Sequence, residues 1–340
     1  MNRLRYTIST LLLLVAVFSI LLGWGTPAWR RAVQQRNLVQ EIIIDGGYDE
    51  PNYDSITYDY EFSRDGTRFL PDARPGWLGR NIDVDLFHDV VGVDISFGGP
   101  RRPGILHDIA QLRNLENLFL PTGGQSDLDL GPLQDMMQLK VLTDLPPEGL
   151  QHIVNCRHLS DLTVGSNVSD SDYRISPSQK SCLSSLTSLR SLSISLDGSD
   201  LDALTGMKNL ATLDLQNCNL GNSSFVNLKE LPNLTTLNLS DTQVSDENLE
   251  HLKHCSRLKV LLLQNASLTD RGTRYISAIE SLEVLDLANT AITDATIMNF
   301  TDMPLLKTLQ ITICSSITEK GEQAFRKISP NVRVTSSFTQ

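Results

Sequence analysis

Residues 210–215 read Leu-Ala-Thr-Leu-Asp-Leu and residues 234–239 read Leu-Thr-Thr-Leu-Asn-Leu, which are two copies of one L-x-x-L-x-L pattern. Further copies begin at Leu258, Leu282 and Leu306, so five consecutive copies are 24 residues apart. Less regular copies begin at Leu115, Leu139, Leu159 and Leu189, a degenerate first copy begins at Val90, and a fading last copy ends at Val334. This constant period predicts a solenoid of stacked repeats, rather than the roughly two separate domains that a chain of this length suggests.

The pattern predicts a short strand, a turn and a short helix in every repeat. In the strand, the L-x-L alternation points two leucines inward and one residue outward. A Ser or Thr followed by an acid, as at Thr269-Asp270, marks a helix start because its side chain can accept a free backbone N–H. We expect about seven inward residues per repeat at ~1.5–3 kcal/mol each. One repeat cannot bury this face alone, so neighbouring repeats must stack.

Two columns of small or apolar residues flank each strand. Three residues before each strand leucine stand Leu112, Met136, Cys156, Leu186, Met207, Leu231, Cys255, Ile279 and Met303. Eight residues after the first motif leucine stand Cys218, Thr242, Ala266, Thr290 and Cys314. Four of the five cysteines lie in these columns, so we predict buried free thiols that pack as small hydrophobes.

These repeats resemble the leucine-rich repeat family, in its ribonuclease-inhibitor-like, cysteine-containing subtype. The Thr-Asp pair after the strand and the Cys/Thr column carry the resemblance, which covers about residues 88–335, or about ten repeats. It implies an α/β horseshoe with a parallel concave sheet and short convex helices. The whole layout is similar to uncharacterised membrane-anchored leucine-rich repeat proteins of planctomycete bacteria. That resemblance implies a topology and a class but no ligand.

The N-terminus predicts a membrane anchor. After a tail at 1–5, residues 6–24 contain no charge and nearly span a ~30 Å hydrocarbon core. Trp24 and Trp29 suit an interface, and three arginines follow. The alternative is a cleaved signal peptide, although the apolar stretch is long for one. Because a short N-terminal tail usually stays inside, we expect a single-pass protein whose C-terminal domain lies on the non-cytoplasmic side.

Residues 25–47 predict a juxtamembrane helix, and residues 48–87 an acidic-aromatic segment. Alternation of apolar and polar residues from Ile56 to Phe62 predicts a strand with one apolar face. We interpret 48–87 as a cap for the first repeat, which solenoids require. The alternative is a polysaccharide-binding or hydrolytic site in 45–90. The Ser-rich insertion 165–180 predicts a surface loop, and 336–340 a tail.

Charge and motifs exclude several function classes. With 29 Lys and Arg against 40 Asp and Glu, the net charge of −11 argues against nucleic-acid binding. The sequence contains no G-x-S-x-G, phosphate-loop or H-E-x-x-H motif, so we predict no enzyme activity and no cofactor. Of the six histidines, only His251 and His254 form a tight cluster of potential metal ligands, together with Cys255. Because Cys255 falls in the buried column, we predict no metal site.

The outward side of the strands is the candidate binding surface. Strands about 4.8 Å apart turn equivalent outward residues into continuous columns. The candidate ligand-binding residues on this concave face are Asp214, Gln216, Asn238, Ser240, Gln264, Asp286 and Gln310. Their hydrogen-bonding groups and mild negative character suit a protein or peptide partner. The alternative is a structural envelope component whose concave face binds nothing.

Overall fold

The computed structural model describes residues 34–35, 56–58, 90–96, 104–121, 128–165, 175–220 and 225–338. The chain divides into two compact units. The first contains residues 1–118 and 127–132, and the second contains residues 119–126 and 133–340.

The first unit begins the repeats. Strand β1 (Ile56–Tyr58) pairs antiparallel with β2 (Val90–Asp94), and Ile56 lies opposite Val93. Helix α3 (Ile105–Ile109) follows, and β3 (Asn117–Phe119) lies at the boundary of the two units. Val90, Val93 and Ile95 are buried, as the degenerate first copy predicts. The predicted strand is confirmed for 56–58, and its remainder lies outside the described residues.

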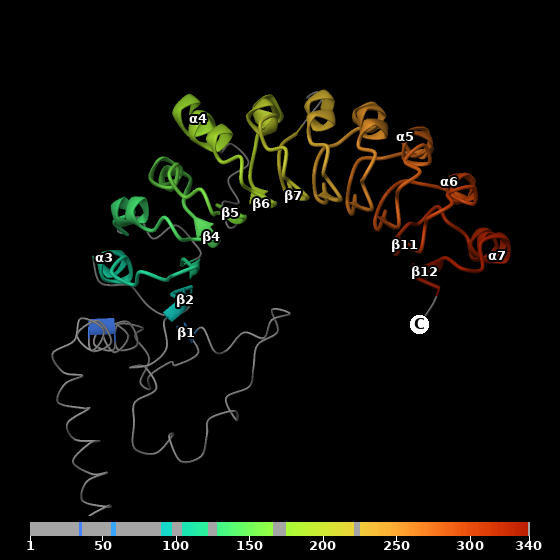
Figure 1. Cartoon of the computed structure of the whole chain (residues 1–340). Coiled ribbons are helices and arrows are strands. Elements are labelled where there is room, and N and C mark those ends of the chain that lie inside the picture. The colour runs from blue at the N-terminus through green and yellow to red at the C-terminus, as the bar shows by residue number, and fades with distance from the viewer. Residues whose placement is uncertain are drawn as a thin grey trace, which may run out of the picture. The chain divides into compact units, whose positions relative to one another are not determined.

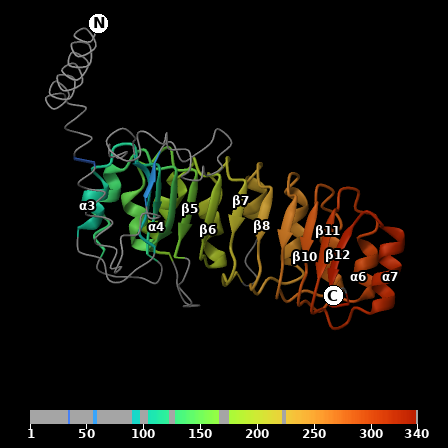
Figure 2. The ribbon, with the colours of Figure 1, turned by 90° about the horizontal axis from the view of Figure 1, so that it is seen from below.

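The second unit contains parallel strands that pair in the order of the sequence (Figures 1 and 2). They are β4 (Val141–Leu145), β5 (Asp161–Val164), β6 (Ser191–Ile194), β7 (Thr212–Asp214), β8 (Thr236–Asn238), β9 (Val260–Leu262), β10 (Val284–Asp286), β11 (Thr308–Ile311) and β12 (Arg333–Ser336). In this unit the strands line the inner side of an arc and the helices lie on its outer side (Figure 1).

The pairing register reproduces the period of the sequence. Leu213 lies opposite Leu237, and each of the next three strands places its own leucine, Leu261, Leu285 and Leu309, at the same level. All five leucines are fully buried. The prediction of a leucine-rich repeat solenoid is therefore confirmed in its strands, its stacking and its core.

The outer side differs from the prediction in the type of helix. Tight 3-10 helices occupy five repeats: η5 (Gly131–Asp135), η6 (Pro147–His152), η7 (Gly198–Leu204), η8 (Phe225–Glu230) and η9 (Asn248–His254). True α-helices are α4 (Pro177–Ser185), α5 (Asp270–Ile276), α6 (Asp294–Asn299) and α7 (Glu319–Ile328). The expectation of a short helix in every repeat is correct in place, but the apolar spacing did not distinguish the two helix types.

The Thr-Asp pair accounts for where the last α-helices begin. Thr269 and Thr293 cap their own helices by accepting the backbone N–H two residues on. Each threonine is also held by the aspartate of the preceding repeat. Asp270 accepts the Thr293 backbone N–H at 2.8 Å and the Thr293 hydroxyl at 2.7 Å. Asp246 holds Thr269 and Asp294 holds Thr318 in the same way. We call these three pairs the Asp–Thr ladder.

The buried columns match the prediction. Cys156, Cys218, Cys255 and Cys314 are buried and unbridged. The Cys/Thr alternation has a physical reason, because both side chains donate to a backbone carbonyl: the Cys314 thiol donates to Leu287 O at 3.1 Å, and the Thr290 hydroxyl donates to the same oxygen at 2.7 Å. Burial raises the pKa of Cys156, Cys218 and Cys255 to about 11, so these thiols stay protonated at neutral pH.

No helix among the described residues is long and apolar enough to cross a membrane. The anchor predicted at 6–24 lies outside the described residues, as does nearly all of the juxtamembrane helix predicted at 25–47. Of the latter, Gln34 and Gln35 are helical, and the Gln34 side-chain amide donates to Gln111 at 3.0 Å.

Candidate functional site

The strand register brings four of the seven predicted residues of the concave face into one row. Asp214 of β7 lies opposite Asn238 of β8. The row continues through Leu262, Asp286 and Gln310 on the next three strands. We call these five residues the concave row. A second row beside it consists of Thr212, Thr236, Val260, Val284 and Thr308.

The exposure of the candidate residues is uneven. All residues of the concave row are half-buried, and Gln216 and Gln264 are exposed. Ser240 contradicts the prediction, because it is only 6% exposed and presents little surface to a partner. Ser240 follows the inward Leu239, so strand alternation would point it outward. However, β8 ends at Asn238, and the chain turns back into the solenoid here, so the alternation no longer applies.

Three side chains of the row, those of Asp214, Asn238 and Asp286, are held by their own turns. One side-chain oxygen of Asp214 accepts the Gln216 backbone N–H at 2.9 Å. Asn238 and Asp286 do the same for the residue two positions on, at 3.0 and 2.9 Å. This Asx-turn orients each side chain without a neighbour from another repeat. In the described part of the chain, the second carboxylate oxygens of Asp214 and Asp286 accept no hydrogen bond.

The concave row has a negative character that no cation balances locally. From β7 to β11, the outward strand positions include Asp214 and Asp286 but no Lys or Arg. Burial holds the pKa of Asp286 above its ordinary value, although the N–H of Ala288 acts in the opposite direction. The lysines nearest in sequence, Lys259 and Lys307, precede their strands and bind Glu283 at 2.8 and 2.5 Å. The row therefore presents acceptors and an apolar centre at Leu262.

A second ladder, which the sequence analysis missed, borders the row where the strands end. The Asn265 amide donates to Asp241 at 2.5 Å, and the Asn289 amide donates to Asn265 at 2.6 Å. Gln216, a predicted site residue, donates to the other oxygen of Asp241 at 3.0 Å. We call Gln216, Asp241, Asn265 and Asn289 the exit ladder. The recurrence of Asn or Asp two residues after the last motif leucine was the signal that could have revealed it.

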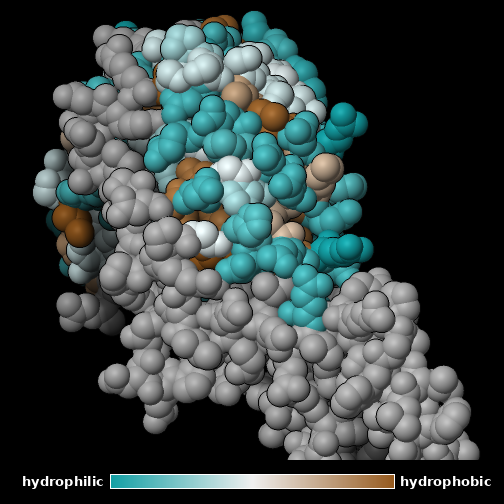
Figure 3. All heavy atoms as spheres, turned by 90° about the vertical axis from the view of Figure 1, so that its left-hand side faces the viewer, coloured by the Kyte–Doolittle hydropathy of each residue, from teal (hydrophilic) through white to brown (hydrophobic). Residues whose placement is uncertain are grey.

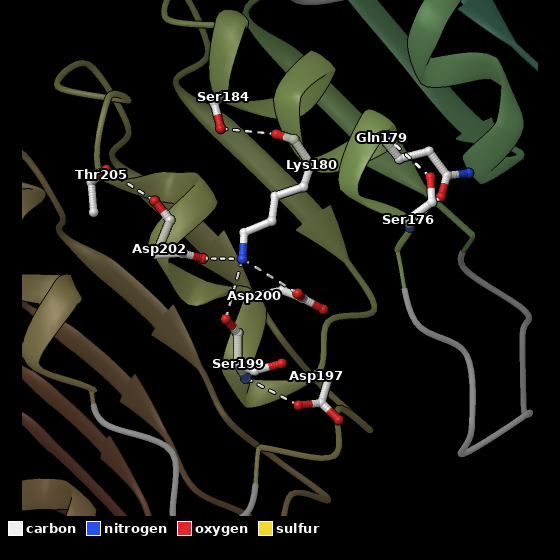
Figure 4. A network of polar contacts seen from close by, with 9 residues as sticks. All are labelled: Ser176, Gln179, Lys180, Ser184, Asp197, Ser199, Asp200, Asp202 and Thr205. Carbon is white, nitrogen blue, oxygen red and sulfur yellow. Dashed lines mark hydrogen bonds and ion pairs between the residues drawn. The ribbon is translucent and has the colours of Figure 1, made fainter.

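The insertion predicted at 165–180 is shorter than expected, because α4 begins at Pro177. Ser176 caps α4 in a reciprocal box with Gln179, an S-P-S-Q signature that marks the helix start. Lys180 then ties α4 to η7 of the next repeat, with Nζ 2.5 Å from Asp202 and 3.6 Å from Asp200 (Figure 4). The hydrogen bond to Asp202 is the main cause that raises the pKa of Lys180. Residues 166–174 lie outside the described residues.

The other candidate sites have less structural support than the concave row. The polysaccharide site considered in 45–90 lies outside the described residues except for 56–58 and Val90. In the described ranges, no group of three His, Cys, Asp or Glu residues could hold a metal ion. Seen from the side on which β2 and α3 lie in Figure 1, the described surface is mostly hydrophilic, with small, separate hydrophobic patches (Figure 3).

Comparisons with known proteins add the following. No protein-family model matches the chain, and no curated protein matches it. Among solved structures, that of an internalin from Listeria monocytogenes is similar to this chain with a TM-score of 0.49 and 20% sequence identity. The match covers 77% of this chain and 72% of the internalin chain. This similarity concerns the fold alone.

Proposed function

We propose that this protein is a non-catalytic interaction module that docks a protein or peptide on the concave row and its neighbouring exposed residues. The observation that carries the proposal is the register itself. It places hydrogen-bonding side chains of four repeats in one line, and three of them, Asp214, Asn238 and Asp286, are held by their own turns. Side chains fixed in this way lose little entropy when a partner binds, which favours binding.

The test is a charge reversal on the row. Replacing Asp214 and Asp286 together by Lys should weaken partner binding at least about tenfold, by slowing association and removing contacts. Glu250→Lys with Glu280→Lys is the matched control, because both residues are exposed, neither belongs to a strand, and the net charge changes equally. The measurement is recovery of a partner from native membranes, followed by titration of the purified partner. Binding that survives the row variant and fails in the control would contradict the proposal.

We also propose that the chain is anchored in a membrane by residues 6–24, with the repeats on the non-cytoplasmic side. The uncharged run and its flanking arginines support this. The full-length chain should stay in the membrane fraction after high-salt and alkaline washing, whereas residues 48–340 alone should be released. Protease added to intact cells should digest the repeats. Release of the full chain by washing would contradict the anchor. Protection of the repeats from protease would contradict their non-cytoplasmic location.

We assign the repeats to the ribonuclease-inhibitor-like, cysteine-containing subtype. The hydrogen-bonded Cys/Thr column and the Thr caps of α5, α6 and α7 support this assignment. The 3-10 helices from η5 to η9 depart from a convex side made of α-helices. The similarity to planctomycete membrane-anchored proteins rests on the sequence layout alone.

A further inference from the structure

One residue on the edge of the sheet departs from a rule that its equivalents obey. The second residue after the last motif leucine has a left-handed backbone in repeat after repeat, as in Asn217, Asp241, Asn265 and Asn289, where φ lies between 54° and 61°. Asn and Asp adopt this conformation more readily than other residues with a side chain. In the next repeat the same position holds Ile313, with φ 62°. A β-branched residue is strained there.

Burial of the side chain does not offset this strain. Ile313 is 66% exposed, whereas its neighbours Ile311 and Cys314 are buried in the core. The exit ladder ends at Asn289, because an isoleucine cannot continue the amide-to-oxygen pattern. The Ile313 backbone N–H donates to Ser337 Oγ at 2.8 Å, next to Phe338, which is 49% exposed. Ile313 and Phe338 form what we call the apolar rim.

The size of the apolar rim argues against a second copy of this chain as its occupant. Two side chains expose far less than the ~800 Å² per partner that a stable dimer needs, so this rim alone does not hold a second copy. Within larger interfaces, however, a few side chains carry most of the binding energy, so a site of two side chains can serve as an anchor there. The concave row provides the larger surface, since Gln310 lies on β11 three residues before Ile313. Gln216 belongs both to the exit ladder and to the candidate residues of the concave face, so these two sets of residues adjoin.

We propose that Ile313 is the apolar anchor for the partner of the concave row, an extended protein segment that places an aliphatic or aromatic side chain against Ile313 and Phe338. This inference rests on the proposed function. It gives the strain a reason, because a residue that weakens the free protein persists where a bound partner uses it.

The experiment uses Ile313→Asn in the full-length chain in detergent micelles. Asn relieves the left-handed strain and can donate to Asn289, so thermal unfolding should move to a higher temperature. The binding probe is a phage-displayed library of random sixteen-residue peptides, selected against the wild-type chain. Selected peptides should bind Ile313→Asn at least about tenfold more weakly. Leu305→Asn is the matched control, because Leu305 is 50% exposed and has no left-handed backbone.

The outcomes separate this inference from the proposed function. Peptides weakened by Ile313→Asn and by the Asp214→Lys, Asp286→Lys variant, but not by Leu305→Asn, support both. Peptides weakened only by the charge reversal overturn the anchor and leave the proposed function standing. If only Ile313→Asn weakens peptide binding, the concave row is not the docking surface, and the proposal that the row and the apolar rim bind one partner is wrong. Failure to select any peptide, or equal loss in Leu305→Asn, overturns the anchor.

Discussion

The strand side and the helical side of the second unit differ in regularity although they belong to the same repeats. On the strand side, β7 to β11 keep one register, with a buried leucine at the same level in each strand. On the helical side, repeats of equal length carry 3-10 helices at η8 and η9 and α-helices at α5 and α6. An equal period therefore does not impose an equal structure on both sides.

The difference shows that separate interactions determine the two sides. The strands need only inward leucines and backbone pairing, which the L-x-x-L-x-L pattern supplies. The α-helices from α5 on begin where the Asp–Thr ladder holds the capping threonine. One repeat earlier, the Ser245 hydroxyl bonds to Glu247 and Asn248 instead, and η9 follows. From η9 to α7, the helix type thus correlates with the bonding of the cap rather than with the apolar spacing. The correlation does not extend to η7, a 3-10 helix that the Asp197 side chain caps.

The largest expected effect lies on the strand side. Leu261 is fully buried between Leu237 and Leu285, so Leu261→Asp places an unpaired charge in the core. We expect a loss of at least about 4 kcal/mol in the free energy of unfolding, measured by urea denaturation. Leu262→Asp, one residue on, should cost at most about 1 kcal/mol, because Leu262 is half-exposed in the concave row and its new charge only faces that of Asp286. Equal losses would show that the assigned register is wrong.

An intermediate effect is expected on the helical side. Asp270 accepts hydrogen bonds from the Thr293 backbone, the Thr293 hydroxyl and Thr296. Asp270→Ala should cost about 1–3 kcal/mol, because buried donors lose their acceptor. Asp302→Ala is the control, since Asp302 is exposed. If both variants unfold at the same urea concentration, the Asp–Thr ladder does not stabilise the helical side.

The acid stability of this variant provides a second readout. Burial acts to raise the pKa of Asp270, but the hydrogen bonds from Thr296 and Thr293 outweigh it and hold the pKa below 3.8. A lowered pKa contributes stability that is present above pH ~3.8 and is lost as the pH falls below it. The difference between wild type and Asp270→Ala should therefore shrink on acidification.

The strand side could be predicted from the sequence because its determinants are periodic. Every residue in the two predicted buried columns that carries an apolar side chain is buried, as Met136 and Ile279 illustrate. The degenerate strand at Val90 was also predicted correctly. The period of the sequence identifies the residues that face inward, and these are the residues that are buried in the structure.

Part of the rest depended on contacts between repeats, which no single repeat contains, and part depended on local turns. The Asp270–Thr293 bonds join residues 23 positions apart, and the exit ladder joins residues 24 or 25 positions apart. The burial of Ser240 and the left-handed backbone of Ile313 follow from the turn that ends each strand, which the strand alternation does not describe. In the candidate site, the residues that form the row were predicted, but the Asx bonds that hold them were not.

The smallest expected effect compares two acids around a single strand, β10. Hydrogen bonds from Lys259 and Lys307 lower the pKa of Glu283, which precedes β10, from 4.5 to about 2. Burial instead raises the pKa of Asp286, at the end of β10, above 3.8. The stability from Glu283 is therefore present above pH ~4.5 and is lost as the pH falls toward 2. Asp286 contributes in the opposite sense, since its stability is present below pH 3.8 and is lost as the pH rises through its folded pKa.

Two conservative variants measure this contrast. At pH 7, Glu283→Gln should unfold at lower urea than wild type, and this difference should disappear near pH 2. Asp286→Asn keeps the oxygen that accepts the Ala288 N–H and removes a partly buried charge, so at pH 7 it should unfold at higher urea than wild type. Salt at 1 M should weaken the Glu283 effect more, because its ion pairs are exposed to solvent and Asp286 is shielded by burial. Shifts of the same sign at pH 7 would mean that the strand-entry charges and the concave row do not differ in electrostatic environment, and Asp286 would then lose its place as a desolvated acceptor for a partner.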